Sequence, residues 1–315
     1  MTLAFTDAGG ARDRTVSPPP AISIVVASFR AYAVLAETLT VLMAMSRGID
    51  VELVVARDSG LDDVEVIRRS FPGVRVVPSP VGPDVPRLRG AGLTAALGTI
   101  VLLTEDHCVP GTDWIVRLSR AVTPHRVAGG GMDNAQTRRG VDWGAYFSEY
   151  GFFDRHRQDT ENVTPALTGA NVGYHRDIVA DVAAWMSNGD WENTVHARLR
   201  ARGLTLHFVP DATAAQNLHY CVAAFCQDRY AHGVDYARTR VDEERWGPVR
   251  RVAMAALAPW LAPLLIRRLY KAAAGPGRRL TFLRAAPWTT VFLCAWSAGE
   301  CVGYLRGSAA RSLST

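Results

Sequence analysis

One segment limits what this chain can fold into more than any other. Residues 99–103 are apolar or β-branched, and the run leads into Glu105, Asp106 and His107. Such a run predicts a buried strand, and buried strands of α/β proteins present ligand groups at their carboxyl ends. On an extended backbone, Glu105 and His107 point to one side and Asp106 to the other. Carboxylate oxygens suit a hard divalent cation, and a borderline cation such as Mn²⁺ also accepts imidazole. We therefore expect a metal site here, and the alternative is an ordinary solvated turn.

The chain before this run alternates between predicted strands and helices. The alternation predicts a parallel, doubly wound sheet whose ligand lies beyond the carboxyl ends of the strands. Because residues 27–32 contain no glycine, the GxGxxG loop of a dinucleotide-binding domain is absent and that function is disfavoured. The expected strands are residues 22–26, 51–55 and 74–77, and the expected helices are residues 33–45, 62–70 and 87–97.

With these residues in place, the chain resembles the family 2 glycosyltransferases of the GT-A fold, over residues 22 to about 240. The resemblance implies an α/β fold with a Rossmann-like mixed sheet flanked by helices. It puts Glu105-x-His107 in the place of the family's DxD motif, which holds the metal that bridges the pyrophosphate of a sugar nucleotide. Mn²⁺ or Mg²⁺ is the implied cofactor, with Glu105 and His107 as ligands and Asp106 at the donor. The ExH departure leaves open which metal binds, and whether Glu105 or Asp106 makes the main contact.

Residues 189–203 resemble a second family block, G-(E)-D-x-x-L-x-x-R-L-x-x-x-G. Counting back from Arg198 puts Trp191 at the usual Glu and Glu192 at the usual catalytic Asp. Glu192 is therefore the expected base for the acceptor hydroxyl, provided that burial raises its pKa, and Asp190 is the neighbour that could replace it. The alternative is an acidic pair that only favours the helix dipole.

Two further segments resemble the acceptor side of the family. Gly169, Ala170 and Asn171 match the GAN segment, where small residues let a backbone approach a sugar and Asn171 offers a donor and an acceptor. Glu149 lies in a segment similar to one that binds sugar hydroxyls, and Trp191 is assigned to the acceptor as well. An ordinary loop at 169–171 and a structural role for Glu149 are the alternatives.

The nucleotide side rests on weaker matches. By position, the resemblance assigns Ala27, Ser28 and Arg30 to the nucleotide. Asp58 is the remaining acidic residue of a DDGS-like turn, and its alignment with that turn is open by one place. Arg89 matches the arginine of the A-R-N-x-G segment, and its guanidinium suits a phosphate. A solvated arginine on a helix face is the alternative for Arg89.

A late histidine binds metal or phosphate in several relatives. After a predicted strand at 206–209, Pro210 is expected to open a loop that leads to His219, our candidate for a third metal ligand. Gln216 lies where the histidine often falls.

The charge of the chain is divided unevenly. Residues 221–315 contain 14 Lys and Arg against 6 Asp and Glu, whereas residues 1–220 contain 21 against 24. A basic, apolar tail suggests an anionic surface as its partner and argues against nucleic acid along the whole protein. We expect a flexible leader at 1–20 without a signal peptide, a catalytic domain at 21–220 and a helical, membrane-facing region at 221–315. The five cysteines include no CxxC pair, which indicates a reducing compartment.

Two apolar stretches lie in the basic tail. Residues 252–266 are uncharged between paired arginines but reach only about 22 Å as a helix, short of the roughly 30 Å hydrocarbon core, so we expect them in the membrane interface. Residues 285–305 are long enough to span. Their polar residues fall near one face, however, so a second in-plane or packed helix is expected. The alternative is that both helices pack on the catalytic body.

The resemblance predicts a metal-dependent inverting glycosyltransferase at the cytoplasmic face of the plasma membrane, bound there as a peripheral or monotopic protein. Its donor would be a UDP- or GDP-sugar, and its acceptor hydroxyl would belong to a glycan, a lipid-linked acceptor or another cell-envelope acceptor. One alternative is a nucleotidyltransferase, which would need a Lys- and Gly-rich phosphate loop after the first strand. The other is a catalytically weak binding or scaffold protein, suggested by the altered DxD and DDGS positions.

Overall fold

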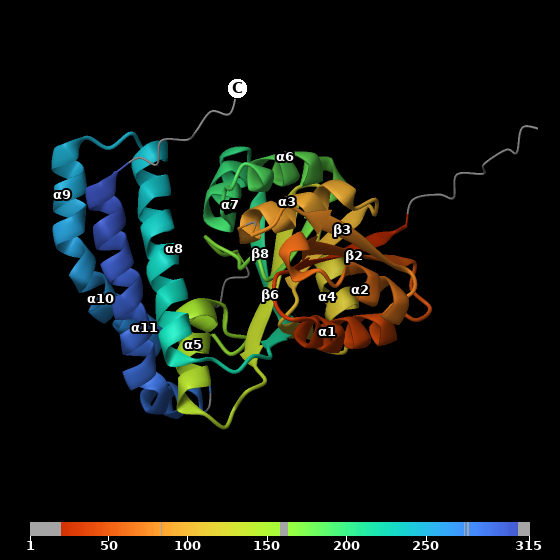
Figure 1. Ribbon diagram of the computed structural model, residues 1–315, viewed down its shortest axis with the longest axis horizontal. Coiled ribbons are helices and arrows are strands. Elements are labelled where there is room, and N and C mark those ends of the chain that lie inside the picture. The colour runs from red at the N-terminus through yellow and green to blue at the C-terminus, as the bar shows by residue number, and fades with distance from the viewer. Residues whose placement is uncertain (1–19, 83, 158–162, 274, 276, 308–315) are drawn as a thin grey trace, which may run out of the picture.

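The computed structural model describes residues 20–82, 84–157, 163–273, 275 and 277–307. Residues 1–19 of the expected leader therefore lie outside the described residues. A single mixed sheet forms the centre, helices cover both of its faces, and a group of long helices stands beside it (Figure 1).

The sheet has eight strands in the described part of the chain, in the order β3-β2-β1-β4-β7-β6-β8-β5. β1 pairs in parallel with β2 and β4, and β2 with β3, as the alternation of strands and helices predicts. β7 pairs antiparallel with β4, which makes the sheet mixed. The strands are β1 (Ile22–Ser28), β2 (Val51–Asp58), β3 (Val74–Ser79), β4 (Ile100–Glu105), β5 (Cys108–Pro110), β6 (Arg126–Asn134), β7 (Asn171–His175) and β8 (Thr205–Gln216).

The helices follow the expected positions in the first half of the chain, within a few residues at their ends. The described part of the chain also contains three short 3₁₀ turns, η1 (Ser59–Leu61), η2 (Gly151–Phe153) and η3 (Ala258–Trp260). The helices are α1 (Tyr32–Met45), α2 (Val64–Ser70), α3 (Val85–Ala95), α4 (Trp114–Ala121), α5 (Gly140–Tyr150), α6 (Arg176–Ser187), α7 (Glu192–Ala201), α8 (Val222–Glu243), α9 (Pro248–Leu257), α10 (Leu261–Ala272) and α11 (Arg278–Arg306).

The central strands are apolar on both faces because helices cover both. Every residue of β1 is buried. One face of the sheet packs against α3, α6 and α7, with Val25 and Leu103 in that core. The other face packs against α1, α2 and α4, with Ile24 and Val26 in the second core. The alternation of residues 24, 25 and 26 between two cores is what a strand buried on both sides requires.

The last strand is longer than the sequence predicts. A loop was expected from Pro210, because proline cannot donate a ladder hydrogen bond. Instead β8 continues to Gln216, and its pairing with β6 shifts register between Gly130 and Met132. This irregularity accommodates Pro210, so the expected loop from Pro210 to His219 was wrong.

The long helices α8 to α11 are packed on the sheet domain through α5. Phe147 of α5 contacts Phe282 of α11, with ring centres 5.1 Å apart. A Cβ at Gly144 would overlap the side chain of Trp288, so α5 and α11 approach closely. The proposed boundary near residue 220 falls just before α8, although this packing leaves the two regions in contact.

One segment is long and apolar enough to cross a membrane by length and composition alone. It covers Pro248–Ala272, with a mean hydropathy of 1.4 over its most apolar window, 17% of which is buried in the structure. α11 differs, because its polar residues Ser297, Glu300 and Tyr304 are buried against other helices. α11 is thus a packed helix, as expected for residues 285–305.

Candidate active site

The end of β4 brings together three side chains that could hold a metal ion. The ligand atoms of Glu105, His107 and Cys108 all lie within 4.8 Å of one another, and the three residues are buried. We call them the candidate metal group. Glu105 Oε2 lies 3.6 Å from His107 Nε2. Carboxylate, imidazole and thiol together favour a borderline cation such as Mn²⁺, Co²⁺ or Zn²⁺ over Mg²⁺.

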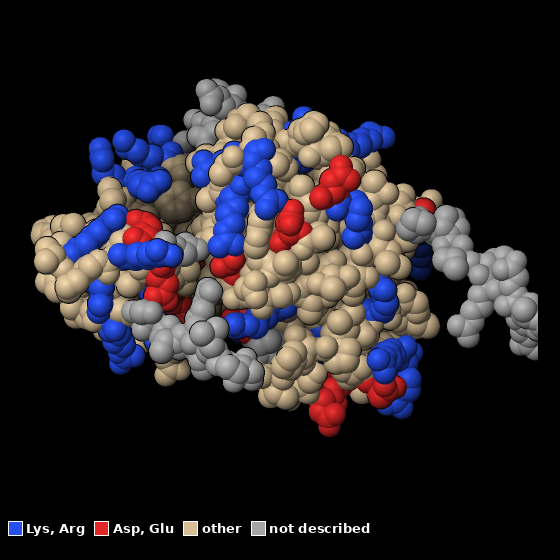
Figure 2. Space-filling view, turned by 90° about the horizontal axis from the view of Figure 1, so that it is seen from above, with Lys and Arg blue, Asp and Glu red and all other residues tan. Residues whose placement is uncertain are grey.

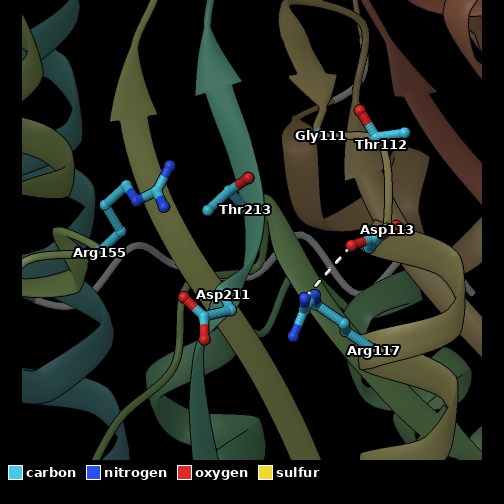
Figure 3. Close-up of a pocket in the computed structure, with 7 residues that line it drawn as sticks. All are labelled: Gly111, Thr112, Asp113, Arg117, Arg155, Asp211 and Thr213. Atoms are coloured by element: carbon cyan, nitrogen blue, oxygen red, sulfur yellow. Dashed lines mark hydrogen bonds and ion pairs between the residues drawn. The ribbon is translucent and has the colours of Figure 1, made fainter.

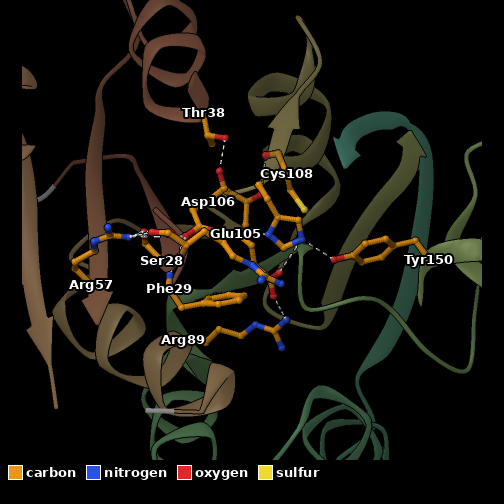
Figure 4. Close-up of polar contacts among 12 residues, drawn as sticks. Ser28, Phe29, Thr38, Arg57, Arg89, Glu105, Asp106, Cys108 and Tyr150 are labelled. Carbon is orange, nitrogen blue, oxygen red and sulfur yellow. Dashed lines mark hydrogen bonds and ion pairs between the residues drawn. The ribbon is translucent and has the colours of Figure 1, made fainter. Parts of the chain in front are cut away.

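Cys108 was not predicted as a member of this group. It is the first residue of β5, and a strand this short gives little sequence signal beyond its position after His107. Tyr150, at the end of α5, lies beside the group, with its hydroxyl 3.3 Å from His107 Nε2 (Figure 4). Burial lowers the pKa of His107, but the charge of Cys108 and the hydrogen bond with Asp106 outweigh it and raise the pKa well above its usual value.

Asp106 lies in the turn after β4, and its two carboxylate oxygens face different partners: Oδ1 lies 3.4 Å from His107 Nδ1, and Oδ2 faces the loop after β1. Its Oδ2 accepts hydrogen bonds from the Ser28 hydroxyl at 3.0 Å and from the backbone N–H groups of Phe29 and Arg30 at 2.8 and 2.7 Å (Figure 4). The residue is fully buried. Its carboxylate therefore fixes the loop after β1, and these contacts replace the direct donor contact that we expected.

Arg57 also holds the loop after β1 in place, and this role was not predicted from the sequence. Its Nη1 donates to the Ser28 hydroxyl at 2.6 Å and to the carbonyl of Arg30 at 2.7 Å. Its Nε donates to Asp63 at 2.9 Å. Ser28 is fully engaged with protein groups, and its expected place near the nucleotide base rests on position alone.

Arg89 joins the candidate metal group to the candidate base. Its Nη2 donates to Glu105 Oε1 at 2.5 Å, and its Nη1 donates to Glu192 Oε2 at 2.7 Å. Burial opposes the charged form of Arg89, but Glu192 and Glu105 raise its pKa above the usual value, so the guanidinium stays charged. The structure thus gives Arg89 two carboxylate partners, where the sequence suggested a phosphate.

Glu192 begins α7, as expected for a carboxylate at a helix start. The expectation that burial raises its pKa is corrected by its surroundings. Burial does raise the pKa of Glu192, but the adjacent guanidinium of Arg89 lowers it more, so the net shift is downward. Asp190 has a different partner, Arg198, whose Nη1 donates to its carboxylate at 2.6 Å.

The GAN segment is close to the site but its side chains face the protein. Asn171 Nδ2 donates to the carbonyls of Gly131 and Ala212, and its Oδ1 accepts from Trp114 Nε1 at 2.8 Å. Asn171 is fully buried, and Ala170 lies in an apolar core. The sugar contacts expected of Asn171 and Ala170 stay predictions, while both residues make internal contacts in the structure. Gly169 is the member of this segment that touches the site, through Arg89.

Two of the other predicted residues have local structural partners. Asp58 Oδ1 accepts from the backbone N–H groups of Gly60 and Gly82, so it caps the turn after β2. His219 Nδ1 lies 2.8 Å from Asp142 Oδ2. Asp142 lies in α5, and His219 is not a member of the candidate metal group. The role of His219 as a metal ligand therefore stays a prediction that this geometry does not support.

The helices α5 and α8 form a wall beside the candidate metal group. Glu149 Oε1 of α5 lies 3.5 Å from Arg229 Nη1 of α8. Burial raises the pKa of Glu149, while Arg229 and His107 oppose that shift. Trp191 packs edge to face against His232 of α8, with ring centres 5.4 Å apart. The sequence identified Glu149 and Trp191, and the pairing of Glu149 with Arg229 becomes visible only when α8 is placed beside α5.

Several buried polar atoms around this wall have no hydrogen-bond partner within the described residues. They are the Nε atoms of Arg30 and Arg229, the hydroxyl of Tyr220 and both amide atoms of Gln216. Gln216 is paired with Cys108 across the β5–β8 ladder. The charges of Glu149, Arg30, Cys108 and Glu105 all act on Tyr220. Buried polar groups are rarely left unpaired by both protein and water, so these atoms are available to a ligand or to ordered water beside the candidate metal group.

A separate hollow of about 330 Å³ lies at the β5–β8 edge of the sheet. Arg117 and Asp113 pair across part of it at 3.2 Å, and Arg155 and Asp211 point toward it (Figure 3). None of its lining residues belongs to the site around Glu105, and its charged side chains already include a paired set.

A family model described as "Glycosyltransferase like family 2" matches residues 18–246. The chain belongs to this family. The match includes β1 to β8 and α8, and therefore every element that contributes to the site. The resemblance read from the sequence is confirmed, and the protein is a glycosyltransferase of the GT-A fold.

Solved structures agree with this fold. The mannosyltransferase PcManGT from Pyrobaculum calidifontis, in complex with GDP-Man and Mn²⁺, matches with a TM-score of 0.55 at 15% identity, over 90% of this chain and 88% of that chain. GalNAc-T7 with UDP, GalNAc and Mn²⁺ matches with a TM-score of 0.45 at 14% identity, over 64% of this chain and 45% of that chain. No curated protein matched the chain by sequence.

Proposed function

We propose that this protein is a divalent-metal-dependent, inverting glycosyltransferase that moves a sugar from a nucleoside-diphosphate sugar to an acceptor hydroxyl. UDP- and GDP-sugars are the candidate donors, because the fold is shared with a mannosyltransferase whose structure contains GDP-Man and Mn²⁺. The nucleotide would lie beyond the carboxyl ends of β1, β2 and β4, where ligands of parallel sheets bind.

One observation carries the proposal. Glu105, which ends β4, and Glu192, which begins α7, are held by the two Nη atoms of one guanidinium. The carboxylate suited to a metal, Glu105, and the carboxylate suited to accept a proton, Glu192, therefore lie on either end of the same guanidinium. Inverting transfer needs this pair, because the leaving diphosphate and the attacking hydroxyl are on opposite sides of one anomeric carbon.

The donor set fits a divalent cation. Glu105 Oε2, His107 Nε2 and Cys108 would hold it, and the buried amide of Gln216 lies next to Cys108. When bound, the cation supplies positive charge for the developing diphosphate. The chain itself provides donors for the same purpose, since the buried Nε atoms of Arg30 and Arg229 have no hydrogen-bond partner among the described residues.

Glu192 is the proposed base. Arg89 lowers the pKa of Glu192, so this carboxylate is ionised at neutral pH and can accept the proton of the acceptor hydroxyl, but it is a weaker base than one with the raised pKa that the sequence led us to expect. The acceptor oxygen forms its bond to the anomeric carbon as the bond from that carbon to the diphosphate oxygen breaks. The proton passes to Glu192, the electron pair leaves with the diphosphate, and a single displacement inverts the configuration.

The tail favours an acceptor near a membrane surface. Val252, Leu257, Trp260 and Leu264 are exposed large apolar side chains on α9, η3 and α10. Arg267 and Arg268 are exposed next to them, and Figure 2 shows basic side chains gathered around the helical part at its left end. Apolar side chains beside arginines suit the interface of an anionic membrane. We therefore propose peripheral or monotopic binding at the cytoplasmic face of a plasma membrane, with a glycan or lipid-linked acceptor in cell-envelope synthesis.

The proposal is tested with a panel of UDP- and GDP-sugars and Mn²⁺. A cognate donor is expected to raise the melting temperature and to be slowly hydrolysed. Hydrolysis should stop with a chelator and in Glu105→Ala, while Arg117→Ala, in the separate hollow, should leave it unchanged. Proton NMR of the transferred sugar identifies the anomeric configuration. Donor binding without any turnover would support the scaffold alternative, and turnover that survives chelation would contradict metal dependence.

A further inference from the structure

Arg89 lies between two carboxylates that come from distant parts of the chain. It belongs to α3, Glu105 ends β4 and Glu192 begins α7. The side chain is 4% exposed, and its two Nη atoms point to different partners, at 2.5 and 2.7 Å. A guanidinium is a rigid, planar fork, so bonds to both of its ends fix the two carboxylates relative to each other.

The protein leaves a space shaped for this fork. A Cβ at Gly169 would overlap the Nη1 atom of Arg89, so the glycine lets the guanidinium lie on the backbone before β7. The middle of α3 is fixed as well, because a Cβ at Gly90 would overlap the hydroxyl of Ser187 in α6. Gly90, next to Arg89 in sequence, thus allows close packing of its backbone, and Gly169, next to it in space, allows close packing of its guanidinium. Neither glycine contact was visible in the sequence.

Arg89 is also the permanent charge next to Glu192. The other titratable groups that act on Glu192 are His196 on α7, Tyr174 on β7 and His232 on α8. Burial lowers the pKa of both histidines to about 4, and burial raises the pKa of Tyr174 above its usual range. All three are therefore neutral at physiological pH.

From this geometry we propose that Arg89 is a positioning residue, which sets the separation of the metal-binding carboxylate Glu105 and the base Glu192 and does not bind the donor phosphate. This inference rests on the proposed function for the roles of the two carboxylates. The bridge, by which we mean the bonds from Arg89 to both Glu105 and Glu192, can be measured without a substrate.

Three variants separate the parts of this role. Arg89→Lys keeps the charge but cannot reach both carboxylates, and Arg89→Gln loses both the charge and the fork. Gly169→Ala leaves Arg89 in the chain but fills the space of its guanidinium. Arg87→Lys is the matched control, because Arg87 lies on the same helix, is exposed and pairs with Asp84. Circular dichroism establishes that each variant is folded.

The first readout needs no donor. In a double-mutant cycle, the free energies of unfolding of Arg89→Lys, Glu192→Gln and the double variant are measured by chemical denaturation. We expect the double variant to unfold at a higher denaturant concentration than the added losses of the two single variants predict. An additive cycle would overturn the bridge, whatever the activity of the protein.

The second readout separates positioning from phosphate binding. Arg89→Lys and Gly169→Ala are expected to lower kcat by about 10²-fold while the affinity for UDP or GDP with Mn²⁺, measured by calorimetry, changes by less than about twofold. In Arg89→Gln the acid limb of the kcat profile should also move to higher pH, because Glu192 loses its cation.

A tenfold or larger loss of nucleotide affinity in Arg89→Lys, with kcat retained, would make Arg89 a phosphate ligand and overturn the proposal. If the wild type binds no sugar nucleotide at all, the proposed function fails, and the double-mutant cycle still decides the bridge.

Discussion

The Cα of Gly299 in α11 lies directly against the carbonyl of Tyr230 in α8, with no room for a side chain between them. Next to this contact, the guanidinium of Arg229 lies over the ring of Trp296, 4.4 Å from its centre. Arg229 also pairs with Glu149 beside the candidate metal group. The packing of α11 on α8 is thus continuous with the wall of the active site, so the helical tail is a structural part of the catalytic unit.

We expect Gly299→Ala to destabilise the protein, because the added methyl group meets backbone, which cannot move aside easily. Overpacking of this kind costs about 1–3 kcal/mol, measured as the free energy of unfolding in urea. Gly247→Ala is the control, since a Cβ there meets nothing within 4 Å. Equal stability of both variants would show that α8 and α11 are not closely packed.

Cys108 is expected to contribute a sulfur ligand. Co²⁺ bound to a thiolate gives a near-ultraviolet charge-transfer band, so wild-type protein titrated with Co²⁺ should show this band and Cys108→Ser should not. Cys294→Ser is the control, because Cys294 is exposed on α11. A band that survives in Cys108→Ser would assign the sulfur to another cysteine, and a wild type without the band would leave Glu105 and His107 as ligands without sulfur.

Asp106 is expected to make the fold sensitive to acid. Burial raises its pKa, but hydrogen bonds from His107 and from the backbone of Arg30 and Phe29 lower it below the usual value overall. A carboxylate with a lowered native pKa stabilises the fold above its unfolded pKa of about 3.9, and this stability is lost as the pH falls through the native value.

Asp106→Asn should therefore lose about 1.5–3 kcal/mol at neutral pH and show a weaker loss of stability below about pH 4 than the wild type. Thermal unfolding followed between pH 3 and 7 measures both effects. Asp113→Asn, at an exposed ion pair, should behave as the wild type does. A parallel acid response in Asp106→Asn would mean that another group titrates.

Glu192→Gln tests the base. The change keeps the size of the side chain but removes the proton acceptor, so kcat should fall by about 10²–10⁴-fold while the affinity for the nucleotide is kept. Asp190→Asn is the matched comparison, because Asp190 is two residues away and is engaged with Arg198. A larger loss in Asp190→Asn would exchange the roles of the two carboxylates.

The parts of this structure that depend on local periodicity could be predicted. The parallel strands β1 to β4 follow from apolar runs. Glu192 at a helix start follows from its spacing to Arg198. Each of these needs only neighbours in sequence.

The parts that failed depend on contacts between distant segments. Asn171 was assigned to a sugar because its amide offers a donor and an acceptor, and in the structure that amide bonds to Gly131, Ala212 and Trp114 inside the protein. The extension of β8 past Pro210 depends on the register shift in β6. The partners of Arg89 depend on Gly169, which lies eighty residues away. No pattern within a single segment contains this information.

The exposed apolar side chains of α9 to α10 lead to a last prediction, on membrane binding. Trp260 is 72% exposed and Leu264 is 47% exposed, so replacing both with glutamate removes little internal packing. The double variant Trp260→Glu, Leu264→Glu should no longer sediment with phosphatidylglycerol vesicles, because the new negative charges oppose both burial in the membrane interface and contact with anionic lipid. Its melting temperature should stay close to that of the wild type. Leu97→Glu is the control for an exposed leucine on the sheet domain and should still sediment.

High salt should weaken but not eliminate wild-type binding, since the arginine contribution is screened and the apolar one is not. Wild-type sedimentation that vanishes completely in salt would assign the contact to charge alone, and binding by the double variant would place the membrane surface elsewhere on the molecule.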